Sequence, residues 1–269
     1  MVTSRLGNPN ISPRLLYPYS PKNLEMSKFA NSPSGFLLNL YHEAGEASGS
    51  FQSAARRLAV NPFAVAKDKT RAREEAARRA RGKIRRYCAT NGLNRFGTLT
   101  YRGEGCHDPT QVRIHVAAFF KGLRAATGGD LPYLWVPEWH ATHGLHVHFA
   151  VARYIRRSMI EASWPHGFVH IKLIGDLPQG SHVRDEARIA ARYLAKYVGK
   201  GFEDHENVGA LHRYDVAQGF KPRPVRIFAP TAKEVMQEAV RRMGGPAQYF
   251  WSSNDDPTWG GVSSLYLSW

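Results

Sequence analysis

The stretch EWHATHGLHVHFAV, residues 138–151, decides how the rest of the chain is interpreted. Apolar and imidazole side chains alternate between Leu145 and Phe149. Successive side chains of a β-strand point to opposite faces, so the apolar residues are expected to face a core. His146 and His148 then share the other face, two residues apart. A strand that carries two imidazoles in this way can present two nitrogen ligands to one metal ion.

A metal site needs more than two ligands, and Glu138 is the best candidate for the third. If residues 141–143 turn a hairpin, Glu138 stands directly opposite His146, and directly opposed residues share a face. A register shifted by one residue would turn Glu138 to the other face, so His140 and His143 remain alternative ligands. One carboxylate and two imidazoles suit Mg²⁺ or Mn²⁺, with Zn²⁺ as the alternative. The competing interpretation is a polar sheet face whose histidines bind no metal.

The composition indicates a polyanionic partner. Among 269 residues, 37 Lys and Arg oppose 22 Asp and Glu, for a formal net charge of +15, and such an excess attracts phosphate-rich ligands. The two cysteines, Cys88 and Cys106, have no metal-ligand spacing and fit a reducing compartment. No run approaches the ~20 apolar residues of a membrane span, and the N-terminus shows no signal-peptide core. We therefore expect a soluble, cytoplasmic protein that associates with nucleic acid.

The pattern along the chain predicts one α+β domain with an extension at each end. Residues 1–60 are rich in Ser, Pro, Asn and Gly, which predicts a mostly irregular N-terminal arm, although Phe36–Tyr41 is apolar enough to dock as one short element. Residues 61–215 hold the main domain, and residues 216–269 form a C-terminal extension with a loop-rich tail. Strands are expected at 96–101, 133–138, 145–151, 168–173 and 225–228, and helices at 67–87, 110–126, 155–163, 182–200 and 232–243.

The helix expected at 67–87 is strongly basic. It contains ten basic and three acidic residues. A solvated helix face is the ordinary interpretation of such a charge run. Given the charge of the whole chain, the other interpretation is contact with the DNA backbone through Arg78, Arg79, Arg85 and Arg86.

The helix expected at 182–200 carries two tyrosines one turn apart, Tyr193 and Tyr197, with Lys196 and Lys200 beside them. A free phenol has a pKa of ~10 and is a weak nucleophile at neutral pH until it is activated or its target is polarised. A metal-bound phosphate would be so polarised, and a nearby ammonium group favours the phenolate. Tyrosines at this spacing also pack commonly at the edge of a core, so the helix alone does not indicate catalysis.

Three motifs, in this order, resemble those of the HUH endonucleases. They are Thr98-Leu99-Thr100, His146-Val147-His148 and Tyr193-x-x-Lys196-Tyr197. The chain is similar in particular to rolling-circle replication initiator (Rep) proteins of bacterial plasmids and small single-stranded DNA phages, over about residues 95–201. The resemblance implies a central antiparallel sheet of about five strands, the HUH or RRM-like palm, which is flanked by helices and carries the metal site.

The activity that this resemblance implies is the nicking of single-stranded DNA at a replication origin. A tyrosine attacks a phosphodiester, keeps the 5′ phosphate as a phosphotyrosine, frees a 3′-OH for a polymerase, and later rejoins the ends. Both Tyr193 and Tyr197 are candidate nucleophiles, and Glu138 matches the acidic third metal ligand. Further DNA contacts are expected from Thr98, Thr100 and Lys200.

The resemblance also implies partners and a location. The sequence contains no Gly-x-x-x-x-Gly-Lys-Ser/Thr loop, so a host helicase is expected to unwind the DNA and a host polymerase to extend the freed end. The location would be the cytoplasm of a bacterial cell. An HUH transposase or a relaxase is the alternative within the same chemistry. More remote alternatives are a non-catalytic DNA-binding protein and a barrel-type metal-dependent hydrolase.

Overall fold

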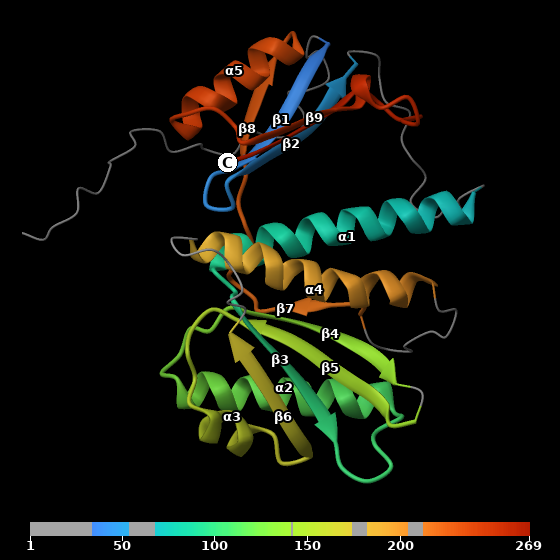
Figure 1. Ribbon diagram of the computed structural model, residues 1–269, viewed down its shortest axis with the longest axis vertical. Helices are drawn as coiled ribbons and strands as arrows, with labels where there is room; N and C mark the ends of the chain where they lie inside the picture. Colours follow the sequence, from blue (N-terminus) through green and yellow to red (C-terminus); the bar gives the residue numbers. More distant parts are fainter. Residues whose placement is uncertain (1–33, 54–67, 141, 174–181, 204–211) are drawn as a thin grey trace, which may run out of the picture.

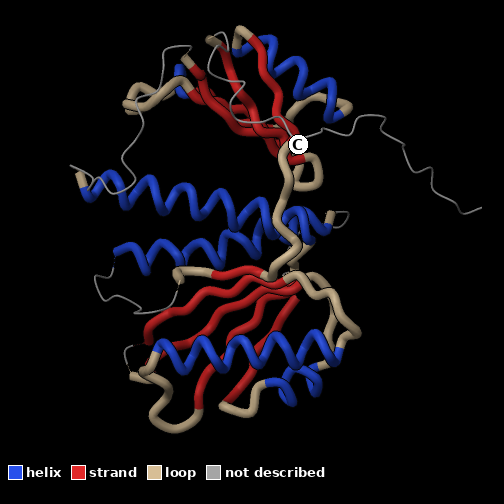
Figure 2. Tube along the Cα trace, turned by 180° about the vertical axis from the view of Figure 1, so that it is seen from behind, coloured by secondary structure: helices blue, strands red, loops and turns tan. Residues whose placement is uncertain are grey.

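The computed structural model describes residues 34–53, 68–140, 142–173, 182–203 and 212–269. The fold is α+β, as expected, and is arranged in layers (Figure 1). One five-stranded sheet lies on each side of a pair of long helices, α1 (Lys69–Asn91) and α4 (Val183–Glu203). Figure 2 shows the same layers from behind, with both sheets separated by the two helices.

The first sheet, here called the histidine sheet, has the strand order β6-β3-β5-β4-β7 and is antiparallel throughout. Its strands are β3 (Arg95–Tyr101), β4 (Tyr133–His140), β5 (Gly144–Val151), β6 (Gly167–Leu173) and β7 (Asp215–Val216). This confirms the antiparallel sheet of about five strands. Four of the strands were expected from alternation, whereas the two-residue β7 was not.

The hairpin between β4 and β5 has the register on which the metal-site prediction depends. Glu138 pairs with His146, and Val136 pairs with His148. Gly144 begins β5 in the left-handed region, at φ 67°. A side chain there would also collide with the backbone of Cys106, because the added Cβ would lie 2.2 Å from its carbonyl oxygen. The glycine therefore lets the hairpin close in this register.

Helices cover the two faces of the histidine sheet differently. On one face lie α2 (Pro109–Ala126) and α3 (Arg157–Ser163), and the apolar residues of β5 are buried against them, as the alternation predicts. On the other face lies α4, which packs along α1 (Figure 1). Small side chains of α4, among them Ala187, Ala190 and Ala191, are buried in that contact. This second face carries the two histidines.

The second sheet, here called the terminal sheet, joins the two ends of the described chain. Its order is β8-β1-β2-β10-β9. The strands are β1 (Gly35–Tyr41), β2 (Glu46–Gln52), β8 (Val225–Ala229), β9 (Tyr249–Ser252) and β10 (Ser264–Ser268), with α5 (Ala232–Met243) on the outer face and a short 3-10 helix, η2 (Ser253–Asp255), between β9 and β10.

The prediction of an irregular N-terminal arm and a loop-rich C-terminal tail is therefore wrong for the segments that build this sheet. Phe36–Tyr41 does form a strand, and β8 and α5 lie where they were predicted. The sequence EASGSFQ of β2 shows no clear alternation, because it is small and polar. It is a strand because β1 and β10 pair with it on both sides. Residues 1–33 and 54–67 of the predicted arm lie outside the described chain.

A buried carboxylate connects the terminal sheet to α1. Glu46 of β2 is 0% exposed, and its oxygens accept hydrogen bonds from Arg85 at 2.7 Å and from Arg86 at 3.1 Å. Tyr266 of β10 donates to the same carboxylate at 3.2 Å. The three donors compensate the cost of burying the charge. Within the described chain no helix is both long and apolar enough to cross a membrane.

Candidate functional site

His148 lies at the centre of the candidate site, on the histidine sheet beneath α4. The residue is 5% exposed. Its Nε2 lies 2.6 Å from Oε2 of Glu138, and its Nδ1 lies 3.1 Å from the hydroxyl oxygen of Thr98. The three residues meet because Thr98 of β3 pairs with His148 of β5, and β4 flanks β5 on the other side. Side chains from the two neighbouring strands thus contact both ring nitrogens of His148 and orient its imidazole.

Aromatic rings pack on the same imidazole. The ring of Tyr197 stacks on His148 at a centroid distance of 3.8 Å, with planes inclined by 16°. Phe96 of β3 lies near-parallel to the imidazole at 5.6 Å, and Tyr193 is tilted against Phe96 at 6.0 Å. Tyr193 is 47% exposed. The structure therefore brings both predicted tyrosines to the histidine-bearing face, and it places Tyr197 directly on the histidine.

His146 shares the sheet face of His148 but has a different neighbour. Its ring stacks on His140 at 4.8 Å, with planes inclined by 14°. Burial, followed by the neighbouring His140 and His148, lowers the pKa of His146 below its usual value, which favours the neutral imidazole. The neutral form is the one that binds metals. Among the described residues, no three His, Cys, Asp or Glu side chains are arranged to hold a metal ion.

Of the two predicted lysines, the structure describes the side chain of Lys196 only. Lys196 lies on the exposed surface of α4, one residue before Tyr197. The side chain of Lys200 lies outside the described part of the chain. Thr100 continues β3 beyond Thr98, and its hydroxyl donates to the carbonyl of Phe168 at 3.4 Å.

The four arginines predicted to bind DNA divide into two kinds. Arg85 and Arg86 point at Glu46, so their guanidinium groups are engaged inside the protein and hold α1 on the terminal sheet. Arg78 and Arg79 are exposed. Arg78 lies over the ring of Trp259 at 5.0 Å, and Arg79 makes a 3.4 Å ion pair with Glu75 on its own helix. An exposed pair of this kind is weak.

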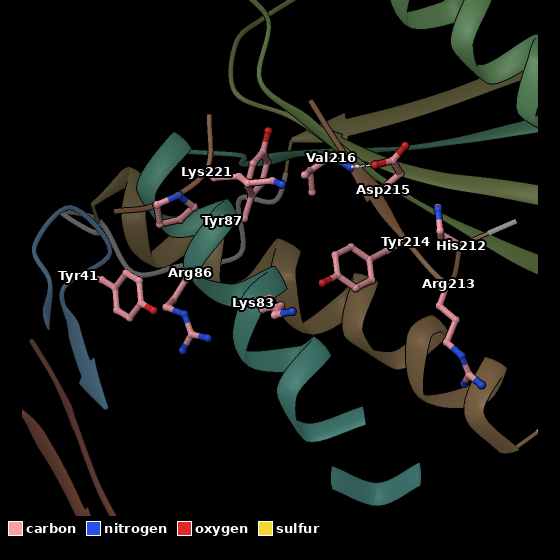
Figure 3. A pocket seen from close by; sticks show the side chains of 11 residues that line it. Tyr41, Lys83, Arg86, Tyr87, His212, Arg213, Tyr214, Asp215, Val216 and Lys221 are labelled. Carbon is pink, nitrogen blue, oxygen red and sulfur yellow. Dashed lines mark hydrogen bonds between the residues drawn. The ribbon is translucent and has the colours of Figure 1, made fainter. Parts of the chain in front are cut away.

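A hollow of about 830 Å³ lies beside α1 (Figure 3). Figure 3 shows Arg86 of α1 beside Tyr41 of β1, and the guanidinium lies 4.7 Å from the ring centroid. Lys83, Arg213 and Lys221 add positive charge, and the lining includes one carboxylate, that of Asp215. Of the residues predicted from sequence, only Arg86 lines this hollow.

Some residues around the site were missed in the sequence. The sequence indicates His140 as an alternative metal ligand, and not as the ring that stacks on His146. The sequence indicates a strand position for Phe96, and not its contact with His148. One signal was present: Phe96, Thr98 and Thr100 alternate along β3, so they share a face of the sheet.

The central part of the chain matches a known family. Residues 94–202 match a family model whose description begins "Replication-associated protein ORF2". This segment runs from the start of β3 to the end of α4, and so includes the histidines, Glu138 and both tyrosines. The match confirms the resemblance to rolling-circle replication initiators over this part of the chain. Comparison with curated proteins and with solved structures gives no match.

Proposed function

We propose that the protein initiates rolling-circle replication by nicking single-stranded DNA at an origin, and that a tyrosine of α4 is the nucleophile. The observation that carries the proposal is the stacking of Tyr197 on His148, whose Nε2 lies 2.6 Å from Glu138. The match of residues 94–202 to a replication-associated family supports the biological role. The net charge of +15 supports a DNA partner.

The reaction exchanges one phosphodiester for another. The phenolate oxygen of the tyrosine attacks the phosphorus atom, the bond to the 3′ oxygen breaks, and the 3′ oxygen leaves with a proton as a free hydroxyl. The 5′ phosphate stays on the tyrosine. Because the phosphotyrosine keeps the energy of the phosphodiester, the same 3′-OH or another one can attack it and rejoin the DNA. Lys196, exposed beside Tyr197, would favour the phenolate.

A divalent metal ion fits this site in the chemistry of its donors. Glu138 and His148 already meet, and Glu138 opposes His146 on the neighbouring strand. The proposal requires the ring of His146 to turn from His140 toward Glu138. A bound Mg²⁺ or Mn²⁺, with Zn²⁺ as the alternative, would act as a Lewis acid on the phosphate oxygens. The contact of Thr98 with Nδ1 would hold the His148 ring so that Nε2 faces the ion.

The remaining partners follow from the same proposal. A host helicase would supply single-stranded DNA, and a host polymerase would extend the 3′-OH. These two activities are proposed on the resemblance alone. An HUH transposase or relaxase would use the same site chemistry, and the choice between them depends on the DNA that is cleaved.

The test is the formation of a covalent protein–DNA adduct. The full chain is incubated with Mn²⁺ and a pool of labelled single-stranded oligonucleotides, and the products are separated under denaturing conditions. The proposal expects an adduct that resists denaturation and that disappears in the Tyr193→Phe/Tyr197→Phe variant. An adduct that persists in this variant, or no adduct with any oligonucleotide of the pool, would contradict the proposed mechanism.

A further inference from the structure

The layer between the terminal sheet and the pair α1/α4 differs from the other layers. The three apolar clusters of the described residues lie between α2/α3 and the histidine sheet, between that sheet and α1/α4, and between the terminal sheet and α5. The inner face of the terminal sheet is instead built from polar and aromatic side chains, among them Asn39, Ser48, Ser50 and Tyr266. This layer is therefore held by polar contacts and leaves space.

That space is a groove of about 890 Å³, here called the arginine groove, lined by residues of the terminal sheet and of the two helices. Seven of its lining residues are arginines of α1 and α4, and none of the lining residues is acidic. Glu46 lies nearby but is engaged by two of the seven, Arg85 and Arg86. Arg81 and Arg192 are exposed and have no ion-pair partner among the described residues. The groove thus carries positive charge that the described protein does not neutralise.

One arginine of the groove is partly buried and has a second arginine as a neighbour. Arg188 of α4 lines the groove and donates hydrogen bonds to the carbonyls of Ala44, Gly45 and Trp269. Burial, and then the charge of the neighbouring Arg184, lowers the pKa of its guanidinium. Bringing in an anion would offset that repulsion, since opposite charges attract strongly where water is partly excluded.

Aromatic rings line the wall opposite the arginines. Tyr249 of β9 is 54% exposed, and Trp251 of the same strand packs edge-on against Trp259 at 5.1 Å. Arg78 of α1 lies over the ring of Trp259 at 5.0 Å. A groove with guanidinium groups on one side and aromatic rings on the other matches the two chemical parts of single-stranded nucleic acid, its phosphates and its bases. In a duplex the bases are already stacked on one another and are not offered to such rings.

We propose that the arginine groove binds a segment of single-stranded DNA, with its phosphates on Arg81 and Arg192 and its bases against Tyr249 and Trp251. The identity of the nucleic acid as DNA rests on the proposed function. The groove lies on the other side of α4 from the histidine sheet. Arg192 directly precedes Tyr193 on α4. A DNA strand that leaves the groove at Arg192 would therefore pass around this helix to the face that carries Tyr193. The groove is thus a holding site beside the proposed nicking site.

The test measures binding without cleavage. The Tyr193→Phe/Tyr197→Phe variant of the full chain is titrated, without added metal, into a fluorescent oligothymidylate of about 12 nucleotides, a length within the usual range for such grooves. Anisotropy gives the affinity at several salt concentrations. In this background, Arg81→Glu with Arg192→Glu is expected to weaken binding by about tenfold or more and to make the salt dependence shallower, by roughly 0.7 in the logarithmic slope per lost phosphate contact.

A matched control separates the groove from total charge. Arg113→Glu with Arg156→Glu changes the net charge equally. Both arginines are exposed, Arg113 on α2 and Arg156 at the start of α3, and these helices cover the face of the histidine sheet that α4 does not. This control is expected to change affinity by less than about twofold, since distant surface charges are largely screened. Tyr249→Ala is expected to weaken binding by about fivefold or more, because each stacked base contributes about 1–3 kcal/mol. Thermal unfolding followed by circular dichroism shows whether each variant is folded.

The outcomes also separate this proposal from the proposed function. Equal losses in the groove variant and its control would overturn the groove assignment, as would tighter binding of a duplex or of a poly-glutamate peptide than of the single strand. Adduct formation by the wild-type chain does not depend on any of these results. Conversely, the wild-type chain could form no adduct while the Arg81 and Arg192 substitutions still weaken single-strand binding. That result would support the groove proposal and contradict the nicking mechanism.

Discussion

The phenol ring of Tyr197 stacks on the imidazole of His148, with ring centroids 3.8 Å apart and planes inclined by 16°. The two residues come from α4 and β5, and they meet because α4 covers the histidine-bearing face of the sheet. The neighbouring Tyr193 is 47% exposed and contacts Phe96 instead. This difference distinguishes two tyrosines that have equal standing in the sequence motif.

We predict that Tyr197 is the nucleophile of the first cleavage. Tyr197→Phe keeps the ring that stacks on His148 but removes the attacking oxygen, so adduct formation should fall by more than about 100-fold. Tyr193→Phe should retain most of the adduct on a single-turnover substrate. Quantified adduct bands from denaturing gels measure both. If Tyr193→Phe is the more damaging change, the stacked tyrosine is a positioning residue and Tyr193 is the nucleophile.

Metal removal should stop the reaction and leave the fold intact. Because Glu138 and His148 already hydrogen-bond to each other at 2.6 Å, the site does not need an ion to stay folded. We expect EDTA to abolish adduct formation and Mn²⁺ to restore it. His146→Ala with His148→Ala should remove metal binding in isothermal titration calorimetry. His42→Ala, at an exposed position between β1 and β2, is the control. Unchanged metal binding in the double variant would contradict the ligand assignment.

Glu46 should contribute strongly to stability. Its buried carboxylate is shared by Arg85, Arg86 and Tyr266. Glu46→Gln leaves two guanidinium groups facing a neutral amide, and breaking a buried pair on one side costs about 3–5 kcal/mol when fully buried. Since the arginines are partly exposed, we expect a loss of roughly 2 kcal/mol in the free energy of unfolding. Urea denaturation measures this loss.

The control for Glu46 is an exposed carboxylate of α1. Glu74 is exposed on α1, so Glu74→Gln should change stability by less than about 0.5 kcal/mol. An equally small effect of Glu46→Gln would mean that the terminal sheet is held on α1 by other contacts.

The two cysteines should differ in reactivity. Cys88 is 0% exposed, and burial raises the pKa of its thiol, whereas Cys106 is only half-buried. The thiolate is the reactive form, so a thiol reagent at pH 8 should modify one cysteine of the folded protein rapidly and the second only after unfolding. Cys106→Ser should remove the rapid phase. Rapid modification of both thiols in the native protein would show that the core around Cys88 opens.

Stability should fall slightly in mild acid because of His115. Its ring stacks on His166 at 3.6 Å, and burial, followed by His166, lowers its pKa below 6.5. The unfolded chain therefore binds more protons just below pH 6.5, so the free energy of unfolding decreases as pH falls from 6.5 toward the folded pKa. Partial exposure limits the effect to under about 1 kcal/mol.

The pH effect can be isolated by substitution. His115→Gln should make the decrease between pH 7 and pH 5 shallower, while the exposed His42→Gln should leave it unchanged. Urea titrations at both pH values measure the difference. A decrease of the same size in His115→Gln and in the wild-type chain would place the titrating group elsewhere.

Much of the histidine sheet follows from local sequence. The alternation from Leu145 to Phe149 and the spacing of Tyr193 and Tyr197 are properties of windows shorter than ten residues, and such windows show which side chains share a face. The predicted pairing of Glu138 with His146 also depends only on a short hairpin, and the structure has this register. Local periodicity is enough when both partners are close in the chain.

The sequence contains no comparable signal for contacts between residues that are far apart in the chain. Glu46 and Tyr266, which hydrogen-bond in the terminal sheet, are 220 positions apart. Neither EASGSFQ in β2 nor SLYLS in β10 has a pattern from which its partner strand could be identified. For the same reason Arg85 and Arg86 were predicted to contact DNA: a charge run shows where positive charge lies along a helix, and not which carboxylate reaches it.

The sequence by itself determined the type of most elements, the face on which the histidines lie and the family resemblance of the central segment. Only the tertiary structure decided that Tyr197 lies on His148, that the chain ends build a second sheet, and that arginines of α1 and α4 line a groove against it. The physical reason is that side-chain direction within one helix or strand is set by backbone geometry, whereas the packing of elements on one another is decided by contacts across the whole chain.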